Sequence, residues 1–184
     1  NPEFLQESNA IRDTIKPHAI VLGGYRTKFM NNTRKFFSRF NPNTPIIITN
    51  HQTAEMIKYA NNSFLATKIS FINQLANICQ KIPDTNIDDI AQAIGLDPRI
   101  GNLFLDAGPG YGGSCLPKDM KAIINLSSTV GVKPTMLNAV EKTNKQQINN
   151  IIELIKQNIG KIKGKKIAVL GVAFKPNTDD IRDS

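Results

Sequence analysis

A single cysteine follows a glycine-rich turn in the segment GPGYGGSCLPKD, residues 108–119. The glycines permit positive φ angles and let the backbone approach a ligand closely. Pro117 suits the first turn of a helix, so Cys115 is expected just before a helix N-terminus. Backbone N–H groups at that end, together with Lys118, would favour a thiolate over a thiol. The pattern is typical of a nucleophilic cysteine, but a tight surface turn with an incidental thiol has the same residues.

Two further pairs of polar residues have a spacing that suits catalysis. Lys58 and Asn62 are four residues apart, on one face of a helix, where both could donate hydrogen bonds to a developing oxyanion. Glu3 and Glu7, also four apart, could divide acid and base work. An exposed Lys–Asn pair and two solvated carboxylates are the ordinary alternatives for these spacings.

The remaining candidate groups are weaker. Asp119 follows Cys115 by one helical turn and could position a water beside the sulfur or interact with the helix dipole. Cys79 falls on an apolar stripe and is most simply a buried small hydrophobe. Nothing near His18 or His51 indicates catalysis, and with two cysteines the chain lacks the spacing of a metal site.

Composition limits the class of protein. The 184 residues carry a net charge of +8, with one dense lysine cluster at Lys161, Lys163, Lys165 and Lys166. Such a cluster is usually a solvated linker and less often an anion or nucleic-acid patch. Scattered lysines without an aromatic platform argue against nucleic-acid binding. No apolar run approaches the ~18 residues of a membrane span. Two cysteines indicate a reducing cytoplasm rather than a disulfide framework. Because the chain starts abruptly, we expect a piece of a longer protein.

The elements that must position these residues follow from the apolar pattern. A short helix is expected from about Ser8, its N-cap. Apolar runs at 19–24 and 44–50 read as strands on either side of a basic helix at 27–39, the β-α-β rhythm of a parallel α/β domain. Apolar residues from Ala54 through Phe64 to Cys79 recur at helical spacing, which predicts one long amphipathic helix over 53–82.

Three more helices and a strand complete the prediction. A helix at 86–94 would be capped by Asp84 or Thr85, and further helices are expected over 118–130 and 134–159. Residues 164–180 read as a basic lead-in, a strand and a loop, with Lys175 at the strand end where open α/β sheets contact ligands. The glycines at 108–113 follow no strand, so they do not form a dinucleotide-binding fingerprint.

Five stretches, taken in order, resemble the UDP-glucose 6-dehydrogenase family of nucleotide-sugar dehydrogenases. They are NPEFLQES at 1–8, EMIKYANNSFLATKISFINQLA at 55–76, DPRIG at 97–101, GPGYGGSCLPKD at 108–119 and GVAFKPNTDDIRDS at 171–184. The resemblance implies an α/β protein with a mainly helical centre. It places the end of an N-terminal Rossmann-like NAD-binding domain at 1–50, a helical dimerisation and catalytic domain at 51–160, and the first strand of a C-terminal UDP-binding domain at 161–184.

The family resemblance also implies a reaction. A sugar C6 hydroxyl is oxidised to an aldehyde, the cysteine forms a thiohemiacetal, a second oxidation gives a thioester, and hydrolysis releases a carboxylate, with two NAD consumed. Cys115 would be the nucleophile, and Lys58 and Asn62 would stabilise the oxyanion and order water. Glu3, with Glu7 as second choice, would be the general base, and Asp119 would handle protons near the thiol.

Binding roles follow from the same resemblance. Lys118 matches a cofactor contact, and Arg99 matches a residue that reaches across a homodimer built on the central helices. The residues that match the UDP-glucose pocket are Phe4, Leu5, Lys58, Asn62, Arg99, Phe104, Gly112 and Lys175. GDP-mannose dehydrogenases share the cysteine loop, so that substrate is the alternative. The 184 residues alone are expected to be inactive, and they could act only as a helical dimerisation module. The family link points to precursors of surface polysaccharides.

Overall fold

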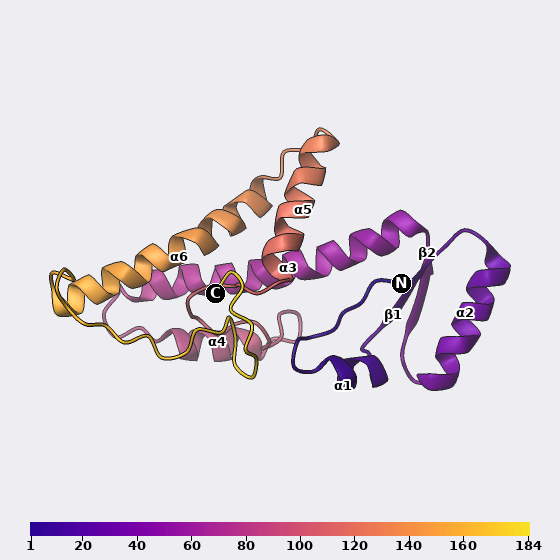
Figure 1. Cartoon of the computed structure of the whole chain (residues 1–184), viewed down its shortest axis with the longest axis horizontal. Helices are drawn as coiled ribbons and strands as arrows, with labels where there is room; N and C mark the ends of the chain where they lie inside the picture. The colour runs from indigo at the N-terminus through magenta and orange to yellow at the C-terminus, as the bar shows by residue number, and fades with distance from the viewer. The chain divides into compact units, whose positions relative to one another are not determined.

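The computed structural model describes all residues from 1 to 184 (Figure 1). The chain forms two compact units, Asn1–Asn61 and Asn62–Ser184, and their boundary falls inside one long helix. The elements in chain order are α1 (Ala10–Ile15), β1 (Ile20–Gly23), α2 (Thr27–Phe40), β2 (Ile46–Thr49), α3 (His51–Cys79), α4 (Ile87–Gly95), α5 (Leu116–Thr129) and α6 (Thr135–Ile159). This helix-rich architecture with a small parallel sheet confirms the predicted fold class.

The first unit is built on a parallel pair of strands. β1 and β2 are in register from Ile20 opposite Ile46 to Gly23 opposite Thr49, and α2 connects them. The side chains of β1 from Ile20 to Leu22 are buried, because helix α2 packs on this strand. A parallel pair requires such a crossover connection, so the β-α-β reading of the sequence is confirmed.

The predicted N-cap of the first helix is wrong. α1 begins at Ala10 with Asn9 at the N-cap position, and Asn9 makes no side-chain capping bond. Ser8 instead has a φ of +73°, and its hydroxyl donates to the carbonyl oxygen of Glu7. A serine in a left-handed conformation cannot present its oxygen to the helix N–H groups as an N-cap in the β region does.

Helix α3 is the long helix that the apolar spacing predicted. It begins two residues earlier than expected, and Asn50 Oδ1 accepts a hydrogen bond from Thr53 N at 2.8 Å near its N-terminus. The predicted buried face is wrong in part, because Phe64 is 63% exposed while Ala66 and Ile72 are fully buried. Small and polar side chains allow neighbouring elements to approach this face closely, and the phenylalanine lies away from it.

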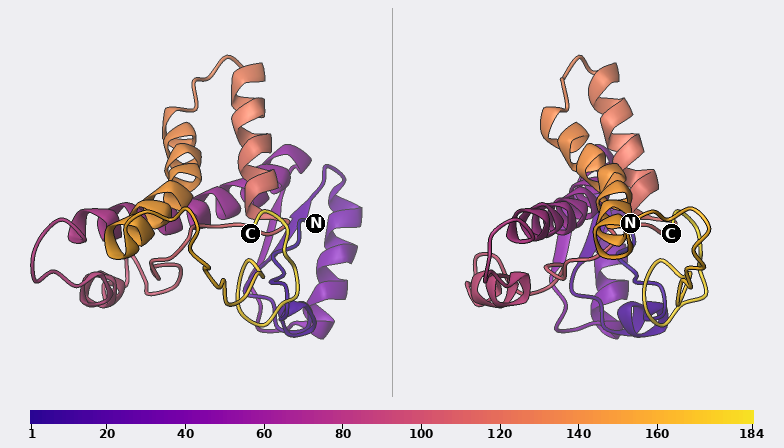
Figure 2. Two further views of the ribbon diagram at one scale, coloured as in Figure 1. Left: turned by 60° about the vertical axis from the view of Figure 1, so that its left-hand side comes forward. Right: turned by 90° about the vertical axis from the view of Figure 1, so that its left-hand side faces the viewer.

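The second unit packs α5 and α6 against α3 around a compact core. Its buried centre consists of Ala66, Tyr111, Met120 and Val140. Helix α6 runs beside α3 in Figures 1 and 2, and Ser70 Oγ donates to the Val140 carbonyl oxygen at 3.2 Å between them. The glycine-rich loop therefore contributes the Tyr111 side chain to the core of the unit.

Two other helix starts differ from the sequence prediction. The N-cap of α4 is Asn86, whose Oδ1 accepts from Asp88 N at 2.8 Å, rather than Asp84 or Thr85. Asp84 has a φ of +61°, so it cannot take the extended conformation of an N-cap. Helix α5 starts at Leu116, two residues earlier than predicted.

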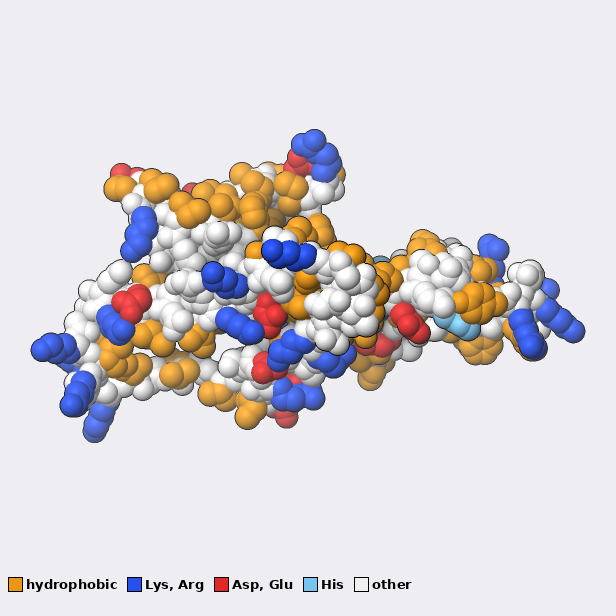
Figure 3. Space-filling model, turned by 90° about the horizontal axis from the view of Figure 1, so that it is seen from above, with side chains coloured by type: hydrophobic (Ala, Val, Ile, Leu, Met, Phe, Trp, Pro, Cys, Tyr) orange, Lys and Arg blue, Asp and Glu red, His pale blue; other side chains and the backbone are white.

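The strand predicted within residues 164–180 is absent. These residues form no helix or strand, and the apolar side chains of Val169 and Leu170 are 76% and 95% exposed. A strand needs a neighbour for its backbone hydrogen bonds, and no partner strand is paired with this segment. Basic side chains gather where α6 ends, the region of the exposed lysines from Lys161 to Lys166 (Figure 3).

Candidate functional site

Cys115 occupies the N-cap position of α5, as the glycine and proline pattern predicted. Its side chain is exposed, and Sγ is 3.6 Å from Ser114 Oγ. Pro117 lies in the first turn, and Asp119 N donates to the Cys115 carbonyl oxygen at 3.0 Å. A substrate in solvent can therefore reach the sulfur, which a nucleophile requires.

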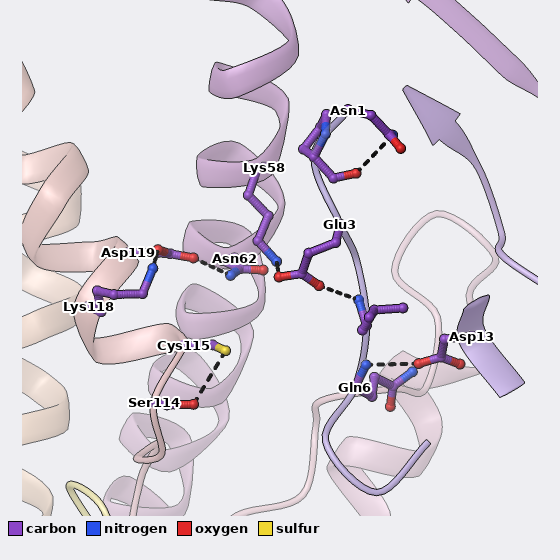
Figure 4. Close-up of polar contacts among 12 residues, drawn as sticks. Asn1, Glu3, Gln6, Asp13, Lys58, Asn62, Ser114, Cys115, Lys118 and Asp119 are labelled. Atoms are coloured by element: carbon purple, nitrogen blue, oxygen red, sulfur yellow. Dashed lines mark hydrogen bonds and ion pairs between the residues drawn. The ribbon is translucent and has the colours of Figure 1, made fainter. Parts of the chain in front are cut away.

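A buried polar cluster lies one turn into α5 (Figure 4). The Asn62 amide of α3 donates from Nδ2 to Asp119 Oδ2 at 2.6 Å, and Lys118 Nζ lies 2.5 Å from Asp119 Oδ1. Asn62 is 5% exposed and the Asp119 side chain 2%. A carboxyl group is buried at low cost only where polar partners replace water. The cluster therefore fixes the orientation of the helix turn that follows Cys115.

In the first unit, Glu3 and Lys58 form an ion pair. Lys58 Nζ is 3.2 Å from Glu3 Oε1, and the Leu5 N–H donates to Glu3 Oε2 at 2.7 Å. The Glu3 side chain is 57% exposed, whereas that of Lys58 is 18% exposed and its ammonium lies 5.7 Å from the centre of the Phe4 ring. The second glutamate, Glu7, is partly buried. Glu3 therefore lies beside Lys58, one of the residues predicted to act with it.

The first unit also contains a pocket of about 350 Å³ beside this ion pair. Glu3, Phe4 and Leu5 contribute to its lining, together with β1 residue Ile20. His18 lines it as well, with its ring 5.3 Å from the Phe4 ring in an edge-to-face arrangement. His18 could not be selected from the sequence, because its contact with Phe4 exists only in the folded chain.

In the second unit, the C-terminal segment packs on the glycine-rich loop. The Gly113 N–H donates to the Arg182 carbonyl oxygen at 2.7 Å. A Cβ added at Gly112 would lie 2.1 Å from the Asp183 carbonyl oxygen, so only glycine fits there. Lys175 Nζ lies 5.5 Å from the centre of the Phe174 ring, which itself contacts this loop. Gly112 and Lys175, two predicted substrate contacts, are therefore brought into one region.

Two other predicted substrate contacts lie in the segment between α4 and the glycine-rich loop. Arg99 is exposed and paired with Asp97, with Nη2 at 2.6 Å from Oδ2. The Arg99 guanidinium lowers the pKa of the Asp97 carboxyl group, chiefly through this hydrogen bond, and the same bond raises the pKa of Arg99. Phe104 has a φ of +64° and is 36% exposed.

Sequence reasoning missed a set of buried and partly buried amides between α3 and α6. Asn73 and Asn77 lie one turn apart on α3, and Asn144 and Gln147 lie one turn apart on α6. Asn73 is 1% exposed and Gln147 5%. Amide side chains at helical spacing on the side of a helix that is expected to be covered are the signal that could have selected them, because a buried amide requires partners.

The structure contains no group of three His, Cys, Asp or Glu residues placed to hold a metal ion. None of its helices has the length and apolar character needed to cross a membrane. Cys79, predicted to be buried, is instead partly exposed near the end of α3. That end of the helix is not covered as completely as its middle.

Comparisons with known proteins agree with this architecture. The chain is 45% identical over 184 residues to UDP-glucose 6-dehydrogenase TuaD of Bacillus subtilis, covering all of this chain and 39% of the relative. It is 46% identical over 186 residues to UDP-glucose 6-dehydrogenase of Rickettsia felis, covering all of this chain and 41% of that relative. A UDP-glucose dehydrogenase from the archaeon Pyrobaculum islandicum has a similar structure, with a TM-score of 0.94 and 36% identity over 100% of this chain and 42% of its own.

The chain thus spans about two fifths of the length of the curated relatives it matches. The central domain of one family matches residues 52–146, slightly more than half of the chain. That range contains the long helix α3, the glycine-rich loop, Cys115 and α5. On this match, the chain belongs to the UDP-glucose/GDP-mannose dehydrogenase family.

Proposed function

We propose that these residues are the central part of an NAD-dependent dehydrogenase that oxidises UDP-glucose to UDP-glucuronate through a thioester on Cys115. The relatives named UDP-glucose 6-dehydrogenase support the substrate, because they match the chain over its whole length. The observation that carries the mechanism is the exposed thiol of Cys115 at the start of α5, one turn before a buried carboxyl group. The helix N-terminus favours negative charge on such a sulfur.

The covalent steps use Cys115 twice. Sγ adds to the carbonyl carbon of the aldehyde, a C–S bond forms, and the thiol proton ends on the carbonyl oxygen of the thiohemiacetal. After the second oxidation the carbon is a thioester. Water then adds to that carbon, the C–S bond breaks, and the products are a carboxylate and the free thiol. Nucleophilic catalysis in this way ties the aldehyde to the enzyme between the two oxidations.

Polar side chains around these steps take the remaining roles. Asn62 and Lys58, one turn apart on α3, donate hydrogen bonds to the oxyanion and order water. Asp119, which is bonded to Asn62 and Lys118, takes part in proton transfer near the thiol. Glu3 is the general base for thioester hydrolysis, because its largely exposed carboxylate can exchange protons with water. Glu7 is the second choice for that base.

NAD supplies the hydride acceptor for both oxidations when it is bound. The residues present offer it one contact, since the Lys118 side chain is 69% exposed and an ammonium group suits a phosphate. The glycines at 108–113 follow no strand, so they do not form a dinucleotide fingerprint. NAD therefore fits this chain only in part. We expect the 184 residues alone to be inactive, and the dinucleotide to be bound largely by segments outside them.

The residues proposed to bind the nucleotide-sugar include Phe4 and Leu5, which line the pocket of the first unit. In the second unit the proposed contacts are Arg99, Phe104, Gly112 and Lys175. The proposal keeps the domain bounds predicted from the sequence: the end of a dinucleotide-binding domain at 1–50, a helical domain at 51–160 and the start of a UDP-binding domain at 161–184.

The test is the stoichiometry of NADH on a panel of sugars, measured on a full-length protein that carries these residues. UDP-glucose should yield two NADH per molecule and UDP-glucuronate, and GDP-mannose should yield none. Turnover of GDP-mannose in preference to UDP-glucose would establish the alternative substrate. One NADH per sugar, with an aldehyde as the final product of the unmodified protein, would contradict the mechanism. The isolated 184-residue chain serves as the inactive control.

A second candidate role is self-association through α3. Phe64, Phe71 and Ile78 are 63%, 50% and 50% exposed and recur at intervals of seven residues, so they share one face of the helix. Exposed apolar stripes of this kind mark interaction surfaces. We expect the chain to elute as a dimer in size-exclusion chromatography and the variant Phe71→Asp to elute as a monomer. A monomeric unmodified chain would refute this role.

A further inference from the structure

Side chains hold the glycine-rich loop before Cys115 at Gly108 and Tyr111, and the Arg182 carbonyl oxygen holds it at Gly113. Asn144 on α6 makes two bonds to Tyr111, since its Oδ1 accepts from the Tyr111 N–H at 2.7 Å and its Nδ2 donates to the Tyr111 carbonyl oxygen at 2.9 Å. An amide that pairs with both backbone groups of one residue acts like a neighbouring strand. Asn144 therefore restrains the backbone of Tyr111 as a paired strand would.

A second residue of the loop, Gly108, is held in the same way from two helices. Its N–H donates to Asn73 Oδ1 of α3 at 2.7 Å, and its carbonyl oxygen accepts from Gln147 Nε2 of α6 at 2.9 Å. Gln147 Oε1 in turn accepts from Asn77 Nδ2 at 3.0 Å. The amides of α3 and α6 thus supply partners for both backbone groups of Gly108, as a buried polar group requires.

Close packing leaves the loop little room to move away from these amides. Gly110 has a φ of +112°, and a Cβ added there would lie 2.4 Å from Asn144 Oδ1. Tyr111 is buried, and its ring belongs to the core of the unit. From Tyr111, three residues lead to Cys115 at the start of α5. The position of the thiol therefore depends on where the amides hold the loop.

We propose that Asn144 and Gln147, with Asn73, are positioning residues that set the location of the Cys115 thiol. The inference rests on the proposed role of Cys115 as nucleophile. It assigns a function to the α6 amides, which touch the glycine-rich loop and act only through it. Misplacing a reacting group by about 1 Å can cost on the order of 100-fold in rate. Loss of the Asn144 bonds should therefore affect the steps that need the sulfur.

Hydrogen exchange on the 184-residue chain tests the restraint without any activity. In Asn144→Ala, the amides of Tyr111 and its neighbours should exchange at least about fivefold faster, as expected for loss of an ordinary hydrogen bond. The neighbouring, exposed Gln146 provides the matched control, and Gln146→Ala should leave the loop unchanged. Unchanged exchange in the loop of Asn144→Ala would overturn the proposal. So would an equal loss of protection throughout α3 and α6, because it would make Asn144 a general structural residue.

Product analysis on the full-length protein tests the consequence for Cys115. Asn144→Ala should slow the second oxidation by about 10- to 100-fold and leave aldehyde, while the first oxidation and the KM for UDP-glucose stay unchanged. Asn144→Asp, which keeps the acceptor for the Tyr111 N–H, should show a smaller loss. Equal slowing of both oxidations in Asn144→Ala would contradict a role of Asn144 in positioning the Cys115 thiol. If Cys115→Ser itself leaves the second oxidation intact, the proposed nucleophile fails, and the exchange result still decides whether the amides restrain the loop.

Discussion

The two carboxyl groups assigned to one reaction lie in opposite environments. The Asp119 side chain is 2% exposed and is bonded to the buried Asn62 amide, whereas the Glu3 side chain is 57% exposed and pairs with Lys58. When a buried polar group loses its partner, water cannot take that partner's place. The members of an exposed ion pair are hydrated whether or not they are paired. The free energy of unfolding should therefore depend on the Asp119–Asn62 cluster, whereas Glu3 can exchange protons with solvent.

The comparison is tested most strongly at Glu3. In the full-length protein, Glu3→Gln should slow release of UDP-glucuronate on the order of 100-fold, because general base catalysis of thioester hydrolysis is lost. Its effect on the free energy of unfolding should stay below about 1 kcal/mol, as for other exposed ion pairs. Rapid-quench product analysis and thermal denaturation measure the two effects. A larger rate loss in the matched variant Glu7→Gln would transfer the role to that residue.

The next largest effect is expected in stability, at Asn62. Asn62→Leu should lower the free energy of unfolding by about 2–3 kcal/mol, because Asp119 then loses a hydrogen bond that water cannot replace. Gln74, exposed on the same helix, gives the matched variant Gln74→Leu, which should change stability by no more than about 0.5 kcal/mol. Chemical denaturation of the 184-residue chain measures both. Equal effects of the two substitutions would show that the buried cluster is no more important for stability than the surface.

Tyr111 is buried like Asp119, but its hydroxyl has no hydrogen-bond partner. Burial, with a smaller contribution from the charge of Glu141, raises its pKa to about 12, above the ~10 of an unfolded chain. The folded state therefore keeps a proton that the unfolded state loses, and stability falls as the pH rises from about 10 to about 12.

The substitution Tyr111→Phe should flatten this alkaline decline and cost little near neutral pH, because no hydrogen bond is lost. Denaturation midpoints at pH 9 and pH 11 measure the effect. The matched variant Tyr59→Phe on α3 should retain the decline seen in the unmodified chain. A decline in Tyr111→Phe as steep as in the unmodified chain would mean that other groups cause it.

The features that sequence could predict are local ones. Glycine and proline spacing placed Cys115 before α5, and helical periodicity predicted α3 and α6 nearly to their ends. The face of α3 that is buried was less predictable. Phe64 is exposed although it follows the apolar spacing, because contacts distant in sequence decide which face is covered.

Features that depend on a partner elsewhere in the chain escaped prediction. The apolar run around Val169 has the composition of a strand, yet it has no strand to pair with. The proposed roles of Asn73 and Asn144 depend on bonds to Gly108 and Tyr111, which lie 35 and 33 positions from them in sequence. Cys115 could be predicted as the reactive group from local sequence, whereas only the fold identified the side chains that contact its loop.

The central claim, a covalent role for Cys115, is tested most directly by the products of Cys115→Ser in the full-length protein. With UDP-glucose and excess NAD, we predict one NADH per sugar at most and no UDP-glucuronate, because the thioester cannot form. Thermal denaturation of the same variant should match the unmodified protein, since the side chain is exposed. Two NADH per sugar and UDP-glucuronate at the unmodified rate would contradict the account.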